Sequence, residues 1–195
     1  MMDTIIGLLI GICLSAACGF RVFIPMLGMS IAAITGHITL AHGFEWIGTS
    51  PALIAFTTAT ALEIGAYYIP FIDHLIDVLI TPTAIAAGII LTASLLGDIS
   101  PFLKWSLAII AGGGASAIVQ GGTVVFRAAS AGTTGGLANF LVATIEFFGS
   151  ALITALAIMI PVLCIFLVLL ICYLMILMIV RSAFIKRLFE RPAPG

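Results

Sequence analysis

Two arginines in otherwise apolar sequence are the residues of this chain best suited to chemistry. Arg21 is the only charged residue between Asp3 and Glu45, and Arg127 stands in a stretch rich in Gly, Ser and Thr from 121 to 136. A guanidinium stays protonated and holds a phosphate or carboxylate through two parallel hydrogen bonds. Because a charge at membrane depth is costly, it marks a candidate functional site there. The two arginines are therefore candidate ligands for an anion.

The sequence around both arginines favours interrupted helices. Gly19 and Pro25 flank Arg21, and both residue types end or kink helices. Non-helical backbone survives at membrane depth only where protein or a wet cavity covers it. We therefore predict broken or re-entrant helices at Arg21 and at Arg127. Around Arg21 the alternatives are a re-entrant hairpin and two tightly joined, tilted helices.

Two glutamates in apolar segments are the predicted counter-ions of these arginines. Each half of the chain has an apolar helix, a Phe-Arg pair and a later helix with a glutamate, so that Arg21 is matched by Glu63 and Arg127 by Glu146. This order favours a loose inverted repeat, the arrangement that brings broken helices together in many transporters. Glu63 and Glu146 are candidate proton carriers, because burial and a neighbouring arginine act in opposite directions on a carboxylate. The alternative is a permanent structural ion pair.

A third polar group follows the helix predicted over residues 51–68. Asp73, His74 and Asp77 share one helical face by their spacing of three and four residues. Carboxylate and imidazole suit a divalent cation, so the group is a candidate gate or cation site. The alternative is a wet face at the membrane surface, since three groups on one turn rarely all face one ion. We predict neither a metal centre nor a cofactor.

The composition defines the fold class. The chain has 195 residues, 63% hydrophobic and 8% charged, with mean hydropathy +1.35, whereas a soluble domain carries about 25% charged residues. We predict one all-α membrane domain over residues 1–195, a polytopic bundle of about five to seven spans. The net charge of -1 argues against a nucleic-acid partner. The four cysteines stand in apolar runs, which favours buried thiols over disulfides.

Topology and assembly follow from the distribution of basic and small residues. Four of the seven basic residues lie near the C-terminus, at Arg181, Lys186, Arg187 and Arg191. The positive-inside rule then predicts a cytoplasmic C-terminus, with residues 182–195 as a basic tail. Membrane lipids are the expected surroundings. The small residues from 112 to 117 and the apolar span from 162 to 180 favour a homodimer or larger assembly.

The order of these features resembles the family of small bacterial membrane proteins known as the domain of unknown function 4126 family. The resemblance covers nearly the whole chain and rests on Gly19-Phe20-Arg21-Val22-Phe23-Ile24-Pro25, Glu63, Ile69-Pro70, Asp73-His74, Asp77, Pro82, Gly88, Arg127, Glu146 and Pro161. It implies a multi-pass protein of the bacterial cytoplasmic membrane and carries no established activity. The family often has an acidic residue after the position of Glu146. Phe147 stands there in this chain, so the acidic pair of the family is absent at this position.

These observations lead to three hypotheses of function. The first is a small transporter or flippase-like protein for an anionic substrate, a small molecule or a lipid headgroup bearing phosphate or carboxylate, with proton coupling through the glutamates. The alternative is a non-transporting scaffold or assembly protein with a buried ion-pair core. An enzyme is the weakest, because the chain has no P-loop, no Ser-His-Asp order and no zinc-protease motif. Transport predicts a cavity that solvent reaches at the arginines, and a scaffold predicts a dry core.

Overall fold

Helices account for the regular secondary structure of the described residues. The computed structural model describes residues 2–67, 73–97, 99–134 and 139–189, with the main chain alone for residues 67, 73–78, 134, 139 and 185–189. The elements in chain order are α1 (Met2–Cys18), α2 (Phe23–Ile34), the 3-10 helix η1 (Glu45–Gly48), α3 (Ser50–Tyr67), α4 (Asp73–Leu95), α5 (Pro101–Leu107), the π-helical η2 (Ala108–Gly113), α6 (Gly114–Thr134), α7 (Asn139–Met159) and α8 (Pro161–Phe189). The predicted all-α class is confirmed.

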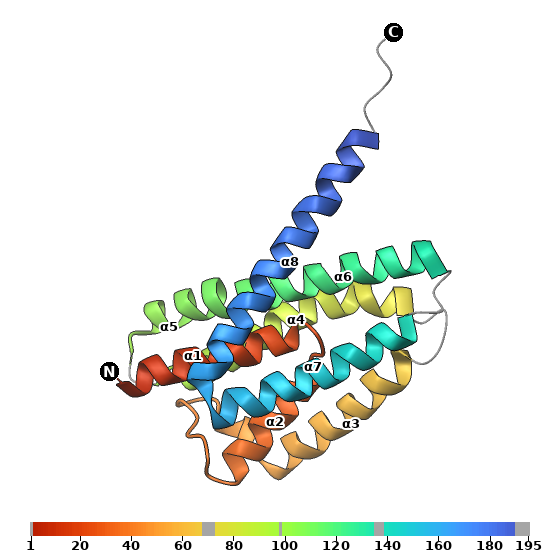
Figure 1. The fold of residues 1–195 in the computed structure, drawn as a ribbon. Helices are drawn as coiled ribbons and strands as arrows, with labels where there is room; N and C mark the ends of the chain where they lie inside the picture. The colour runs from red at the N-terminus through yellow and green to blue at the C-terminus, as the bar shows by residue number, and fades with distance from the viewer. Residues whose placement is uncertain (1, 68–72, 98, 135–138, 190–195) are drawn as a thin grey trace.

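Helix α1 is the centre of the bundle. It contacts α2, α4, α6, α7 and α8, and Figure 1 shows it in red among them. Small residues allow this close packing: a Cβ added at Gly11 would lie 2.9 Å from Thr92 Cα of α4. The hydroxyl of Ser15 donates to the carbonyl of Gly88 at 2.6 Å and lies 2.8 Å from the hydroxyl of Thr92. Close approach with interhelical hydrogen bonds is the usual way in which helices associate in lipid.

The predicted break at Arg127 is wrong. Residues 101–134 form one continuous run of α5, η2 and α6, and Arg127 lies inside α6. The glycines before Arg127 serve packing: a Cβ on Gly121 would meet Ile179 of α8 at 3.4 Å, and one on Gly122 would collide with Met175. Because α8 covers this part of α6, tertiary packing offsets the low helix propensity of glycine.

The chain turns a corner between α7 and α8. Ile160 alone separates the two helices, and Pro161 is the first residue of α8, a position where the missing N–H of proline costs nothing. The start of α8 packs on the bundle through buried Cys164 and Val168. Figure 1 shows α8 in blue crossing the other helices and extending beyond them.

Three helices of the described residues are long and apolar enough to cross a membrane: Pro101–Thr133, Phe140–Met159 and Pro161–Phe184. Met2–Cys18, Phe23–Ile34 and Leu79–Leu95 are shorter apolar helices. These lengths and compositions support a membrane protein. The total of about five to seven spans and the re-entrant character of any segment stay predictions.

Candidate functional site: a buried cluster of two arginines and two glutamates

The break around Arg21 is the first element of the site. Helix α1 ends at Cys18, and the N–H of Arg21 still donates to the carbonyl of Ala17 at 3.1 Å. Gly19 is required here, because a Cβ would lie 2.6 Å from Val119 Cβ and 2.8 Å from the carbonyl oxygen of Ser116. The new helix α2 then begins at Phe23, so Arg21 lies in the short connection. The interruption predicted from Gly19 and Pro25 is confirmed.

Glu63 of α3 binds the start of α2. Its Oε1 accepts the N–H of Val22 at 2.9 Å, and its Oε2 accepts the N–H of Phe23 at 3.1 Å. The first N–H groups of a helix have no partner within the helix, and a carboxylate there also meets the positive end of the helix dipole. Pro25 is the third residue of α2 and has no N–H, which is tolerated because an N–H in this first turn would have no partner within the helix. The carboxylate of Glu63 therefore acts as a cap supplied by another helix.

Glu146 of α7 is shared by the two arginines. Arg127 Nε donates to Glu146 Oε1 at 3.0 Å, and Arg127 Nη2 donates to Glu146 Oε2, so the pair is bidentate. Arg21 Nη2 lies 3.5 Å from the same Oε2 and donates to the carbonyl of Ala143 at 3.0 Å. Arg21 thus contacts α7 through both a carboxylate and a main-chain oxygen. Two guanidinium groups from distant parts of the sequence converge on one anion.

Burial makes this cluster electrostatically strong. Arg21 is 2% exposed, Glu146 3%, and Glu63 and Arg127 6% each. At such depth the dielectric is low, so interactions between charges are stronger than at a surface and removal of one partner is costly. The two cations and two carboxylates balance formally.

The cluster lies toward one end of the bundle. Arg127 is about 10 Å of helix rise from the end of α6 at Thr134, and Glu146 about 10 Å from the start of α7 at Asn139, at about 1.5 Å per residue. Glu63 is closer still to the end of its helix, about 6 Å from Tyr67 by the same rise. The opposite end of the bundle has a hollow of about 640 Å³ lined in part by Asp3, His37 and His42.

The structure thus brings together the four residues predicted as substrate ligands, and the predicted pair of Arg127 with Glu146 is present. Glu146 serves both arginines, and the carboxylate of Glu63 binds main-chain N–H groups beside Arg21. The predicted likeness of the two Phe-Arg stretches does not extend to the backbone, because Arg21 lies in a break and Arg127 inside a helix.

Asp73, His74 and Asp77 occupy the start of α4, where their side chains lie outside the described part of the structure. Their role as a gate or cation site stays a prediction. Among the described side chains no group of three or more His, Cys, Asp or Glu could hold a metal ion.

The four cysteines are free thiols. At the start of η1, outside the candidate spans, main-chain N–H groups of Glu45 itself and of Gly43 hold the pKa of the Glu45 carboxyl below its ordinary value.

Ser150 is a member of the site that the sequence analysis missed. Its hydroxyl donates to the carbonyl of Ala17 at 3.1 Å and lies 3.4 Å from that of Arg21. The carbonyl of Ala17 already accepts the N–H groups of Phe20 and Arg21, so Ser150 adds a hydrogen bond from α7 to the end of α1. Ser150 follows Glu146 by four residues and so shares its helical face. That spacing is the signal that could have identified it.

The fold and the cluster indicate an α-helical membrane protein with a buried site of mixed charge. The family model described as Domain of unknown function (DUF4126) matches residues 8–181. The chain belongs to this family, as its resemblance indicated. No curated protein and no solved structure matches the chain.

Proposed function

We propose that the protein is a small transporter or flippase-like protein for an anionic substrate, with the buried cluster as its closed substrate site. The observation that carries the proposal is the convergence of Arg21 and Arg127 on the single carboxylate of Glu146. Two guanidinium groups around one carboxylate form the geometry with which proteins recognise a phosphate or carboxylate ligand. Glu146 then occupies the place that the anionic group of a substrate takes in the transport cycle.

The N-terminus of α2 supports the same proposal. A broken helix whose N-terminus points at an anion within the membrane domain is a recurring part of transporter sites. In this chain the carboxylate of Glu63 occupies that N-terminus, on the N–H groups of Val22 and Phe23. Both anion-recognition elements therefore hold carboxylates of the protein itself. Protonation of Glu63 or Glu146 would free an element for substrate, which would couple substrate movement to protons.

A structural role for the cluster is the second candidate, and burial favours it. Arg21 is 2% exposed and Glu146 3%, as a dry ion-pair core requires. In this alternative the protein is a scaffold or assembly partner in the membrane, and the four charges hold α2, α3, α6 and α7 in register. Transport differs from it in one respect: the site has to open to water in part of the cycle.

Cys18 allows that difference to be tested. Its thiol is fully buried and lies 3.8 Å from the carbonyl of Val22, beside the site. The matched control is Cys164, which is also fully buried and lies at the start of α8. In liposomes, a variant with Cys18 as its sole cysteine and a variant with Cys164 as its sole cysteine are exposed to a charged methanethiosulfonate reagent. Transport predicts labelling of Cys18 and protection of Cys164.

Substrate class is tested on the same preparations by thermal shift. Inorganic phosphate, succinate and phosphatidylglycerol serve as probes, because ligand binding to the folded state raises the unfolding temperature. Arg21→Lys keeps the charge and removes the bidentate geometry, so a stabilising probe should lose its effect there. Lys104→Arg, at a basic residue of α5 outside the buried cluster, is the charge-preserving control. Protection of Cys18 under all conditions, with no stabilising probe, would favour the scaffold.

We also propose a location, a topology and an assembly state for the protein. The protein resides in the bacterial cytoplasmic membrane, with its C-terminus in the cytoplasm, as the basic residues from Arg181 onward favour. Its assembly is a homodimer or larger. Mass measurement in nanodiscs tests this state, and a monomer there would contradict it.

A further inference from the structure

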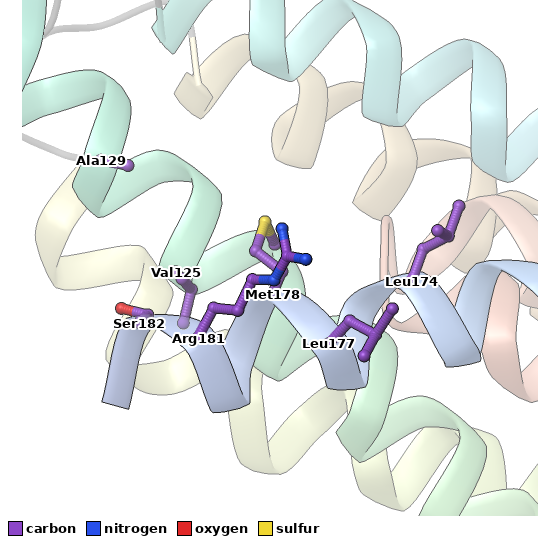
Figure 2. A pocket seen from close by; sticks show the side chains of 7 residues that line it. All are labelled: Val125, Ala129, Leu174, Leu177, Met178, Arg181 and Ser182. Atoms are coloured by element: carbon purple, nitrogen blue, oxygen red, sulfur yellow. The ribbon is translucent and has the colours of Figure 1, made fainter. Parts of the chain in front are cut away.

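The outer side of α6 and α8 has an apolar groove with a cationic end. The groove encloses about 490 Å³ and is lined by Val125 and Ala129 of α6 and by residues of α8 that include Leu174 and Met178. Arg181 and Ser182 stand at its end (Figure 2). This volume is within the range of about 300–1,000 Å³ that is usual for small-molecule sites.

The groove is separate from the buried cluster, although both involve α6. Val125 and Ala129 are four residues apart and share one face of the helix. Arg127 lies between them in sequence and projects into the bundle, where it pairs with Glu146. The groove therefore opens away from the interior, and its ligand does not need the proposed transport site to open.

Arg181 gives the groove a preference for one charge. It is exposed, and among the described residues no carboxylate lies within ion-pairing distance of it. Figure 2 shows its side chain running back toward Met178. Ser182, the next residue, adds a hydroxyl to the lining of the groove. An apolar wall that leads to a guanidinium and a hydroxyl suits an amphiphile with an anionic head.

The position of this end along α8 identifies the amphiphile. Arg181 directly follows the apolar run from 162 to 180, where a span meets the headgroup layer, and Lys186 and Arg187 follow in the sequence. Basic residues next to a span attract anionic lipids. A second copy of the chain fits less well. Copies with the same topology would place Arg181 of each at the same membrane surface, so a parallel α8 contact would bring like charges together.

We propose that the groove between α6 and α8 binds an anionic phospholipid, with an acyl chain along Val125, Leu174 and Met178 and the phosphate at Arg181 and Ser182. The shape and charge of the groove carry this inference, and it does not depend on transport. The lipid would cover the face of α8 that is exposed beside α6 and would fix the angle at which α8 leaves the bundle.

The experiment compares lipid binding to the whole protein in detergent by native mass spectrometry. Phosphatidylglycerol is expected to bind in preference to phosphatidylcholine, and Arg181→Gln is expected to lower the affinity for phosphatidylglycerol about fivefold, the usual effect of one basic residue near a membrane surface. Arg181→Lys should keep most of the preference. Inorganic phosphate alone should not compete, because the acyl chain supplies the contact with the groove.

The apolar wall is tested by filling it. Ala129→Leu adds volume inside the groove and should weaken binding of both lipids, whereas Ala128→Leu, at an exposed neighbour outside the lining, should not. Both alanines are exposed, so neither change disturbs the core. Equal binding of the two lipids by the wild type, or unchanged binding in Arg181→Gln and Ala129→Leu, would overturn the proposal. A dimer that dissociates in Ala129→Leu without loss of lipid would assign the groove to a second copy.

Discussion

Glu146 is the residue on which the stability of the buried cluster depends most. Breaking a buried ion pair by removing one partner costs about 3–5 kcal/mol. Glu146 pairs with Arg127 in bidentate fashion and lies 3.5 Å from Arg21, so Glu146→Gln affects two buried cations. We expect it to cost about 5 kcal/mol, at the upper end of that range. Arg127→Met leaves the contact of Arg21 with Glu146 and should cost about 3 kcal/mol.

Thermal unfolding in detergent measures this order. For a chain of 150–250 residues, about 1 kcal/mol shifts Tm by about 2–4 °C, so Glu146→Gln should melt about 10–20 °C below the wild type. Glu45→Gln is the matched control, since its carboxylate is exposed at the start of η1, and it should melt close to the wild type. The double variant Arg127→Met with Glu146→Gln should lose less than the sum of the single losses, because the two residues are in contact.

Two results would refute the shared-anion reasoning. The first is a Tm of Glu146→Gln equal to that of Glu45→Gln, since the carboxylate of Glu146 would then contribute nothing to the free energy of unfolding. The second is a larger loss in Arg127→Met than in Glu146→Gln, because the structure gives Glu146 two arginine partners. Additive losses in the double variant would show in addition that the bidentate contact is absent in solution.

Three further outcomes are expected. Glu63→Gln should cost about 1–2 kcal/mol, in the range of a lost helix cap, and should speed hydrogen exchange at the N–H groups of Val22 and Phe23; unchanged exchange would contradict the cap. Gly19→Ala should destabilise the protein by about 1–3 kcal/mol through overpacking, whereas Gly149→Ala, where an added Cβ meets nothing within 4 Å, should be neutral or stabilising; equal melting of the two would count against the close approach. A reporter enzyme fused after the basic tail should be active in the cytoplasm, and activity outside would reverse the topology.

The break at Arg21 could be predicted from sequence, and the continuity at Arg127 could not. Glycine serves both as a helix interruption and as a point of close helix contact, and a single sequence does not distinguish the two. At Gly19 the chain leaves the helix, while Gly121 and Gly122 stay helical because α8 packs on them. The difference depends on a partner helix distant in sequence.

The members of the charged cluster and the pair of Arg127 with Glu146 were predictable from sequence, but the second contact of Glu146, with Arg21, was not. A charge in an apolar run needs a partner, which identifies Arg21, Arg127, Glu63 and Glu146. Which carboxylate meets which cation depends on the rotation of each helix about its axis. The binding of Glu63 to main-chain N–H groups has no signal in side-chain charge at all. Sequence patterns predict which residues share one face of a helix, but the way in which the helices cross decides which faces are in contact.

The separation of Arg21 from α7 along the chain has a consequence for synthesis. Glu63 follows Val22 by 41 residues, but Ala143, whose carbonyl binds Arg21, follows Arg21 by 122. Domains fold from the N-terminus as they emerge from the ribosome, so the Arg21 segment enters the membrane long before α7 exists. The hydrogen bonds with Glu63 then form before those with α7, and closure by α7 is a late event. A ribosome stalled before α7 should hold an Arg21 segment that insertion factors still recognise as unfinished.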